Sequence, residues 1–340
     1  MGFSRTGRIP ALLSVLALAG AVTATGCARG LLPVSEPRIP PAASGAGHRD
    51  ATVSHSPPVV HAVARKLGMG FIYLTAGPDQ GNQNVWVIHH GSERQLTFRS
   101  KKNGVTSAGA AAAGIVVSDD QFNADDLGKV TVRGIWWLPT GRPARLHQGS
   151  SATISASGQI AFIAVPDAVG YRDSKNFELR IQDSFTSKSR VIYASPTPLS
   201  DPVFGPRHQI AFIRQPKASD YASTTVMLRS ADGHVHSVRT GLANAQSLVW
   251  SANAPDLVVA TWPLKAVAIG RNGSRIRLPD GWFPMCWNPL GSRLLVASET
   301  KIGFWKPGRP ATVRVIGPLS PGMVVGTATW LKHRASLSVP

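Results

Sequence analysis

Short apolar runs separated by turn residues dominate the chain from residue 59 to its end. The run Val85–Ile88 is apolar at every position, which is typical of a strand covered on both faces, and it is too short for a helix. Residues 90–93 then supply a turn, and residues 95–98 alternate polar and apolar side chains. Residues 82–98 therefore predict a β-hairpin.

Apolar strands of the same kind recur six times along the sequence. They are residues 70–74, 114–117, 160–163, 210–213, 257–260 and 294–297, so their starts lie 37 to 50 residues apart. Four of them follow shorter phrases that we interpret as inner strands ending in tight turns, at residues 154–158, 203–206, 249–252 and 286–289. Further strand pairs follow, around turns such as Ala231-Asp232-Gly233 and Arg271-Asn272-Gly273. This period is that of a four-stranded propeller blade.

The first repeat lacks an inner strand, because its first apolar run already has the character of a second strand. The C-terminal phrase Val325–Leu331 reads as an inner strand with no strand after it. We therefore expect the last strand to complete the first blade and to close the ring. The predicted fold is all-β: a six-bladed β-propeller of four-stranded antiparallel blades. Seven blades is the alternative, because the blade between residues 105 and 150 is poorly marked in the sequence.

The hairpin also carries a family resemblance. Its phrase Gly81-Asn82-x-Asn84-Val85-Trp86-Val87, followed by Arg94-Gln95-Leu96-Thr97-Phe98, resembles the repeat of the TolB-like, WD40-like β-propeller family. TolB-like proteins also have an N-terminal α/β domain, whereas only a spacer precedes the first strand here. The resemblance therefore covers the propeller alone, at residues 59–340, and it implies a non-enzymatic scaffold that binds a protein or another ligand.

The first 26 residues have the pattern of a lipoprotein signal peptide. Arg5 and Arg8 form a positive region, and the apolar run Ala11–Val22 is too short to span a bilayer comfortably. The small residues before Cys27 resemble a bacterial lipobox, which implies cleavage between Gly26 and Cys27 and covalent lipid on the cysteine. The alternative is an ordinary signal peptide whose cleavage site contains a cysteine.

Residues 27–58 are rich in proline and small polar residues and show no apolar periodicity. Such a segment buries too little surface to offset its ordering entropy, so we expect a flexible tether behind the acylated cysteine. The expected location is the outer face of the cytoplasmic membrane or the periplasm, with the lipid as anchor.

The charge of the chain is strongly positive. There are 36 Lys and Arg against 18 Asp and Glu, a net charge of +18, and loss of Arg5 and Arg8 leaves +16. An exported protein does not meet nucleic acid routinely, so we expect no nucleic-acid partner. Anionic lipid head groups or wall polymers are the expected counter-surface, and an unknown envelope protein is the other expected partner. We expect a monomer.

Catalytic and metal-binding patterns are sparse. With Cys27 acylated, Cys286 remains between Met285 and Trp287, as a packed thiol. His234 and His236 point to one side of a strand, but the pattern offers no third ligand, so we expect no metal and no cofactor apart from lipid. The phrases interpreted as inner strands contain no carboxylate. The alternative function is an extracytoplasmic propeller enzyme, lactonase-like or a glycan-acting hydrolase, that uses loop acids and a metal.

The predicted loops divide into two sets with different charge. Loops between second and third strands are long in the first four blades and hold most acids; this candidate ligand face comprises Asp79, Asn82, Asp119, Asp120, Asp125, Asp126, Asp167, Tyr171, Asp173, Asp220 and Tyr221. Turns between third and fourth strands are short and basic; this candidate anionic-surface face comprises Arg142, Arg145, Lys188, Arg190, Arg271, Arg275, Lys306 and Arg309. Long loops commonly carry recognition, so we assign the ligand to the first face.

Overall fold

The computed structural model describes residues 70–78, 83–97, 105–122, 130–137, 144–166, 174–216, 223–261, 264–308 and 312–335. Side chains are left out of this description at residues 106, 119–122, 130–137 and 144–148. The predicted signal peptide, with Gly26 and Cys27, and the predicted tether lie outside the described residues. Within these ranges no helix is long and apolar enough to cross a bilayer.

The described strands pair into six antiparallel sheets of four strands each, which we number as blades in chain order. Blade 1 contains β24 (Val324–Leu331), β1 (Phe71–Gly77), β2 (Asn84–His89) and β3 (Ser92–Gln95). Blade 2 contains β4 (Val105–Ala111), β5 (Gly114–Phe122), β6 (Val130–Trp137) and β7 (Ala144–Gln148). Blade 3 contains β8 (Ser150–Ile154), β9 (Ile160–Ala164), β10 (Phe177–Gln182) and β11 (Arg190–Ser195).

The remaining blades repeat the same order of strands. Blade 4 contains β12 (Leu199–Phe204), β13 (Ile210–Arg214), β14 (Thr225–Arg229) and β15 (Val235–Val238), with the short 3-10 turn η3 (Pro206–His208) after β12. Blade 5 contains β16 (Ala245–Val249), β17 (Leu257–Thr261), β18 (Lys265–Ile269) and β19 (Arg275–Arg277). Blade 6 contains β20 (Phe283–Trp287), β21 (Leu294–Ala297), β22 (Lys301–Trp305) and β23 (Val313–Pro318). An all-β propeller of four-stranded antiparallel blades is thus confirmed.

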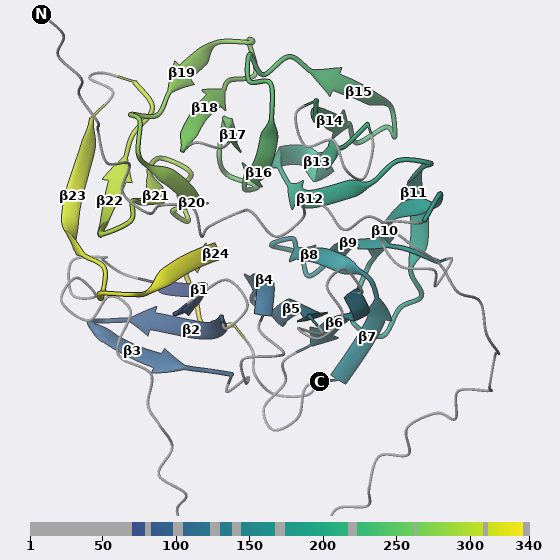
Figure 1. Ribbon diagram of the computed structural model, residues 1–340, viewed down its shortest axis with the longest axis horizontal. Coiled ribbons are helices and arrows are strands. Elements are labelled where there is room, and N and C mark those ends of the chain that lie inside the picture. The colour runs from purple at the N-terminus through teal and green to yellow at the C-terminus, as the bar shows by residue number, and fades with distance from the viewer. Residues whose placement is uncertain are drawn as a thin grey trace, which may run out of the picture.

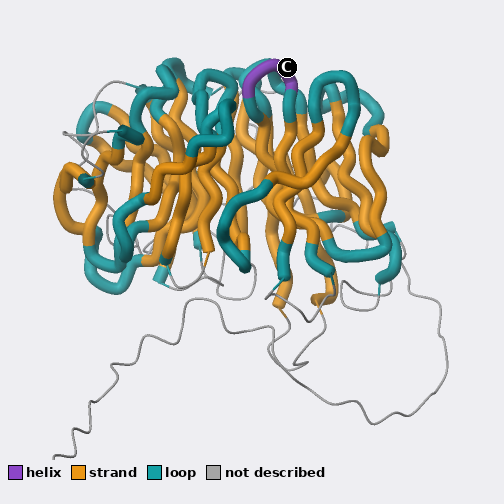
Figure 2. Tube along the Cα trace, turned by 90° about the horizontal axis from the view of Figure 1, so that it is seen from above, coloured by secondary structure: helices purple, strands orange, loops and turns teal. Residues whose placement is uncertain are grey.

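The blades are arranged around a common centre, with the first strand of each blade innermost (Figure 1). The inner strands contact one another in the order β24, β4, β8, β12, β16 and β20, and β20 contacts β24 in turn. Seen from the side, the strands run between two faces, and η3 lies at one of them (Figure 2). Because neighbouring strands are antiparallel, turns after first and third strands share this face, and connections after second and fourth strands share the other.

The second strands are apolar throughout because neighbouring blades bury both of their faces. In β17, Leu257 and Val259 pack against blade 4, whereas Val258 and Ala260 pack against blade 6. The same division occurs at the other blades, and the described core consists of six clusters, each between two neighbouring blades. The period of short, wholly apolar runs in the sequence is therefore the period of these two-sided strands.

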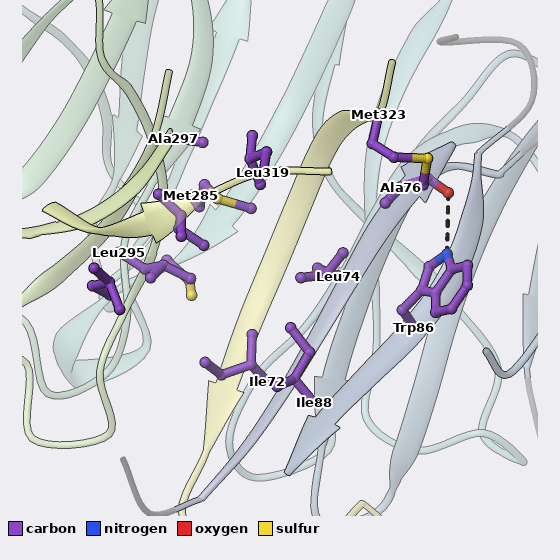
Figure 3. Packing of buried hydrophobic residues seen from close by; sticks show 13 residues of the cluster. Ile72, Leu74, Ala76, Trp86, Ile88, Met285, Leu295, Ala297, Leu319 and Met323 are labelled. Carbon is purple, nitrogen blue, oxygen red and sulfur yellow. Dashed lines mark hydrogen bonds between the residues drawn. The ribbon is translucent and has the colours of Figure 1, made fainter. Parts of the chain in front are cut away.

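The C-terminal strand β24 pairs with β1 along its length, from Phe71 opposite Leu331 to Gly77 opposite Val324. A hydrophobic cluster then joins blade 1 to blade 6; it includes Leu74 and Ile88 of blade 1 with Met285 and Leu295 of blade 6 (Figure 3). In the same cluster the Trp86 indole Nε1 donates to the Ala76 carbonyl oxygen at 3.3 Å. The first and last described strands, β1 and β24, are thereby packed into one sheet and one core.

The inner strands begin earlier than the sequence predicts. In blades 3 to 6 each inner strand starts three or four residues before the phrase interpreted as that strand. The phrase contains only the end of the strand and the turn that follows it. A bulge interrupts the alternation of each described inner strand: the register shifts between Ser150 and Thr153, between Ser200 and Val203, and at the corresponding places in the other blades. Because a bulge adds residues to one strand alone, the alternating pattern is broken at the start of each inner strand.

Candidate functional site

A central channel runs between the six inner strands and has a volume of about 1300 Å³. Its wall combines small side chains and hydroxyl groups, such as Ser107, Ser151 and Thr327, with apolar side chains, such as Val203 and Met285. Pockets for small molecules in proteins commonly have this combination of apolar wall and few polar groups. The channel is therefore the candidate binding site.

The bulges lie at a common level near one end of the channel, and side chains satisfy the backbone amides there. Ala108 donates its N–H to the Thr327 hydroxyl at 2.8 Å, and Ala152 donates to the Ser118 hydroxyl at 2.8 Å. Leu248 likewise donates to Asp201 Oδ2 at 3.1 Å. Each bond joins the inner strand of one blade to a side chain of the preceding blade, so it links neighbouring blades at the channel wall.

Asp201 differs from the other side chains of this level because it is ionisable. It lies in the bulge of β12 with a left-handed backbone, φ 51°, as does Ser151 in β8 with φ 53°. Its side chain is partly exposed, toward the channel that it lines. Burial raises the pKa of Asp201 to about 6, against the opposing effects of the hydrogen bonds from the Leu248 N–H and the Ser247 side chain.

Asp201 contradicts the sequence-based expectation that inner strands hold no carboxylate. That expectation took β12 to begin at Val203, whereas the strand begins at Leu199 and includes Asp201. The position of Asp201, between the apolar residues Leu199 and Val203, was the sequence signal that it belongs to a strand. Its left-handed backbone conformation was harder to predict, because a residue before proline usually avoids the helical regions of the backbone and Pro202 follows directly.

The two mouths of the channel differ in charge. Arg207 and His208 follow β12 at the η3 face, both exposed and both with left-handed backbones, and Lys332 follows β24 at the same face. Glu299 lies between β21 and β22 at the opposite face. The level of Asp201 is near this opposite face, because inner strands begin there. The cations Arg207 and Lys332 thus lie at one end of the channel, and the carboxylates Asp201 and Glu299 lie toward the other.

Two of the predicted ligand-face residues do not lie in a loop. Asp119 and Asp120 belong to β5, because this strand continues to Phe122 and pairs there with β6, and their side chains lie outside the description. The other members of that set lie outside the described residues: Asp79, Asn82, Asp125, Asp126, Asp167, Tyr171, Asp173, Asp220 and Tyr221. Their role in recognition stays a prediction.

The predicted anionic-surface residues are placed in part. Lys188, Arg190, Arg271, Arg275 and Lys306 are exposed and flank turns between third and fourth strands, which share the η3 face. Arg145 lies in β7 without a described side chain, and Arg142 and Arg309 lie outside the described residues. The described members of this set therefore lie at one face, and their role at an anionic surface stays a prediction.

The other candidate groups occupy ordinary structural positions. Cys286 is buried in the cluster between blades 6 and 1, and burial raises the pKa of its thiol. His236 lies in the strand β15, His234 directly precedes it, and both side chains are exposed. Among the described residues, no three His, Cys, Asp or Glu side chains gather as metal ligands.

No model of a known protein family matches the sequence, and no curated protein matches it. Similar solved structures include TolB from Acinetobacter baumannii, 13% identical with a TM-score of 0.58, over 77% of this chain and 66% of that one. A chain of a nidogen–laminin complex is 12% identical with a TM-score of 0.53, over 78% of this chain and all of that one. The likeness to TolB-like propellers predicted from residues 81–98 is therefore confirmed for the fold.

Proposed function

We propose that this chain is an exported, lipid-anchored, six-bladed propeller, closed by its C-terminal strand, that binds a ligand in its central channel without converting it chemically. The observation that carries the proposal is the channel itself, about 1300 Å³ in volume and lined by hydroxyl and apolar groups of the inner strands. Shape and hydrogen bonding in such a wall favour binding.

Two features of the sequence support the proposed location. Residues 24–27 provide a lipobox after an apolar run, and residues 28–58 supply a spacer between anchor and propeller. The exposed Lys188, Arg271 and Lys306 at the η3 face favour contact with an anionic membrane or wall surface. A likeness to TolB fits a place in the cell envelope, and such a protein would meet its partner there.

A channel-filling variant tests the proposal. Gln246 lines the channel in the bulge of β16, so Gln246→Trp places a ring in the open volume, whereas Arg277→Trp adds the same ring on the exposed outer strand β19. Chemical cross-linking in intact membranes should capture a partner with the wild type and with Arg277→Trp, and lose it with Gln246→Trp. Equal capture by all three folded proteins would contradict binding in the channel.

A second candidate function is that of an extracytoplasmic hydrolase. The specific observation in its favour is Asp201, since a carboxyl with a pKa of about 6 in a channel is suited to general acid–base work. Lactone or glycan turnover that Asp201→Asn abolishes would favour this function. Stoichiometric Ca²⁺ in the purified protein would point the same way, toward the loop acids as ligands.

A further inference from the structure

Asp201 is a carboxylate on the channel wall without a cationic partner among the described residues. Its oxygens accept hydrogen bonds from the Leu248 N–H, at 3.1 Å, and from the Ser247 side chain. A carboxylate has about four acceptor positions, so two donors leave part of its capacity unused. No described charged group acts on it strongly enough to lower its pKa. The wall therefore presents negative charge that no described group neutralises.

The backbone holds this carboxylate in place. Asp201 has a left-handed conformation, φ 51°, directly before Pro202, and both lie in a bulge. A non-glycine residue in this region costs about 1–3 kcal/mol and persists where the surroundings determine it, often at functional sites. The position of the Asp201 side chain is thus fixed by β12 and by its bond to β16.

Polar groups of blade 1 lie across the channel from Asp201. β12 and β24 are separated by two inner strands in either direction around the ring, so they are opposite each other. Gln83 is buried, 4% exposed, and its Oε1 lies against Gly326 of β24, where a Cβ would come within 2.5 Å of it. Gly326 therefore permits an amide oxygen at the channel wall, on the side that faces the carboxylate.

The charges at the two mouths make the channel electrostatically asymmetric. Arg207 and Lys332 would repel a cation at the η3 face, whereas Asp201 and Glu299 would attract one toward the other end. A ligand with one cationic end and an apolar body fits both this polarity and the apolar wall.

We propose that the channel binds a small organic cation, a primary amine attached to an apolar group, with its ammonium against the Asp201 carboxylate. This inference rests on the proposed function, that the channel receives a ligand, and adds the ligand's chemical class. An ammonium next to Asp201 supplies the missing counter-charge through a charge-assisted hydrogen bond. Binding would also lower the raised pKa of the carboxyl, because an adjacent cation favours its ionised form.

Calorimetric titration of the full chain with three matched probes at pH 8 tests the inference. The probes are phenethylammonium, neutral phenethyl alcohol and anionic 3-phenylpropionate, which share an aromatic group and differ in charge. The wild type should bind the ammonium at least about 10-fold more tightly than the alcohol, and the carboxylate least. Equal affinity for ammonium and alcohol in the wild type would overturn the inference without any variant.

Asp201→Asn removes the charge and keeps an acceptor for the Leu248 N–H, and Asn tolerates the left-handed backbone. It should abolish the preference for ammonium, whereas Asp280→Asn, at an exposed acid away from the channel, should leave it unchanged. An unaltered preference in folded Asp201→Asn overturns the inference, and so does Ca²⁺ displacing phenethylammonium stoichiometrically. Gln246→Trp that binds all three probes as the wild type does would instead contradict binding in the channel, which is the proposed function, so the two failures are distinguishable.

Discussion

The Trp330 indole stacks on the Phe304 ring, with centroids 5.6 Å apart and planes 21° apart. Trp330 belongs to β24 of blade 1, and Phe304 belongs to β22 of blade 6. Nearby, Ala335 donates its N–H to the Tyr73 hydroxyl at 2.9 Å, between residues 262 positions apart in the chain. Trp330 thus contacts the last blade, and Ala335 is bonded to the first.

Deletion of residues 323–340 should prevent stable folding. It removes β24, which pairs with β1, and leaves Leu74 and Met285 of the cluster between blades 6 and 1 without cover. We expect aggregation or loss of a cooperative melting transition in circular dichroism. Deletion of residues 336–340 alone is the control, and a truncated chain that melts like the wild type would contradict this role of β24.

A milder version of the same test is Trp330→Ala. It removes the stacking on Phe304 and the other apolar contacts of the half-buried Trp330 side chain, so we expect a loss of about 2 kcal/mol in the free energy of unfolding. Urea titration measures the loss. Leu290→Ala is the control, because the Leu290 side chain is 79% exposed and should change stability little.

Replacement of Asp201 by Asn should stabilise the protein at alkaline pH. The pKa of this carboxyl is raised from 3.8 to about 6, so the folded state holds its proton more tightly and stability falls as pH rises through that window. The difference corresponds to roughly 3 kcal/mol above pH 6. Asp201→Asn should gain up to that amount at pH 8 and little near pH 4, close to the unfolded pKa of 3.8. Denaturant melts at the two pH values provide the measurement, and equal gains at both would disprove the linkage.

Cys27→Ala should release the protein from membranes. Without the lipid acceptor the chain lacks its proposed anchor, so it should move to the soluble extracytoplasmic or secreted fraction. Cell fractionation and metabolic labelling with a radioactive fatty acid measure the two effects. Cys286→Ala is the matched control, because this thiol is buried in the core between blades and should not affect anchoring. A Cys27→Ala protein that fractionates like the wild type would contradict the lipoprotein interpretation.

Charge reversal on the η3 face should weaken binding to anionic vesicles. Lys188 and Arg271 are exposed there, and each cation near a lipid surface contributes about 1 kcal/mol, so Lys188→Glu with Arg271→Glu should lower affinity at least about 30-fold. Lys265→Glu with Lys301→Glu is the control, because these exposed residues begin third strands at the opposite face. Co-sedimentation of lipid-free protein with phosphatidylserine vesicles at two salt concentrations measures both pairs. An equal effect of the two pairs would show that net charge alone, rather than this face, governs the binding.

Much of the fold could be predicted because the second strand of each blade is buried on both faces. A strand such as Leu257–Thr261 packs against two neighbouring blades, so it must be apolar at successive positions, and this pattern recurs in every blade. The pairing of β24 with β1 could also be predicted, since one blade lacked a first strand and the chain ended with a spare one.

The site could not be predicted because it depends on the irregular part of each inner strand. Bulges move the start of these strands away from simple alternation, so the sequence pattern predicts an inner strand from Val203, whereas β12 begins at Leu199 and includes Asp201. Its approach to Leu248 joins residues 47 positions apart and follows from the ring arrangement, which no local pattern contains. The basic residues were easier to group, because turns between third and fourth strands share a face whatever their detailed shape.

The adjacency of the first and last described strands, β1 and β24, in blade 1 means that the chain could begin at another blade without a change in the order of the blades around the ring. Gly70 lies against Leu331, since a Cβ at Gly70 would come within 2.5 Å of the Leu331 carbonyl oxygen. A short linker across this junction, with the chain opened instead at the exposed turn 271–273, would preserve every strand pair described. Such a circular permutant should fold, and its new ends would lie on the η3 face, where a surface tether could be attached beside the cationic mouth of the channel.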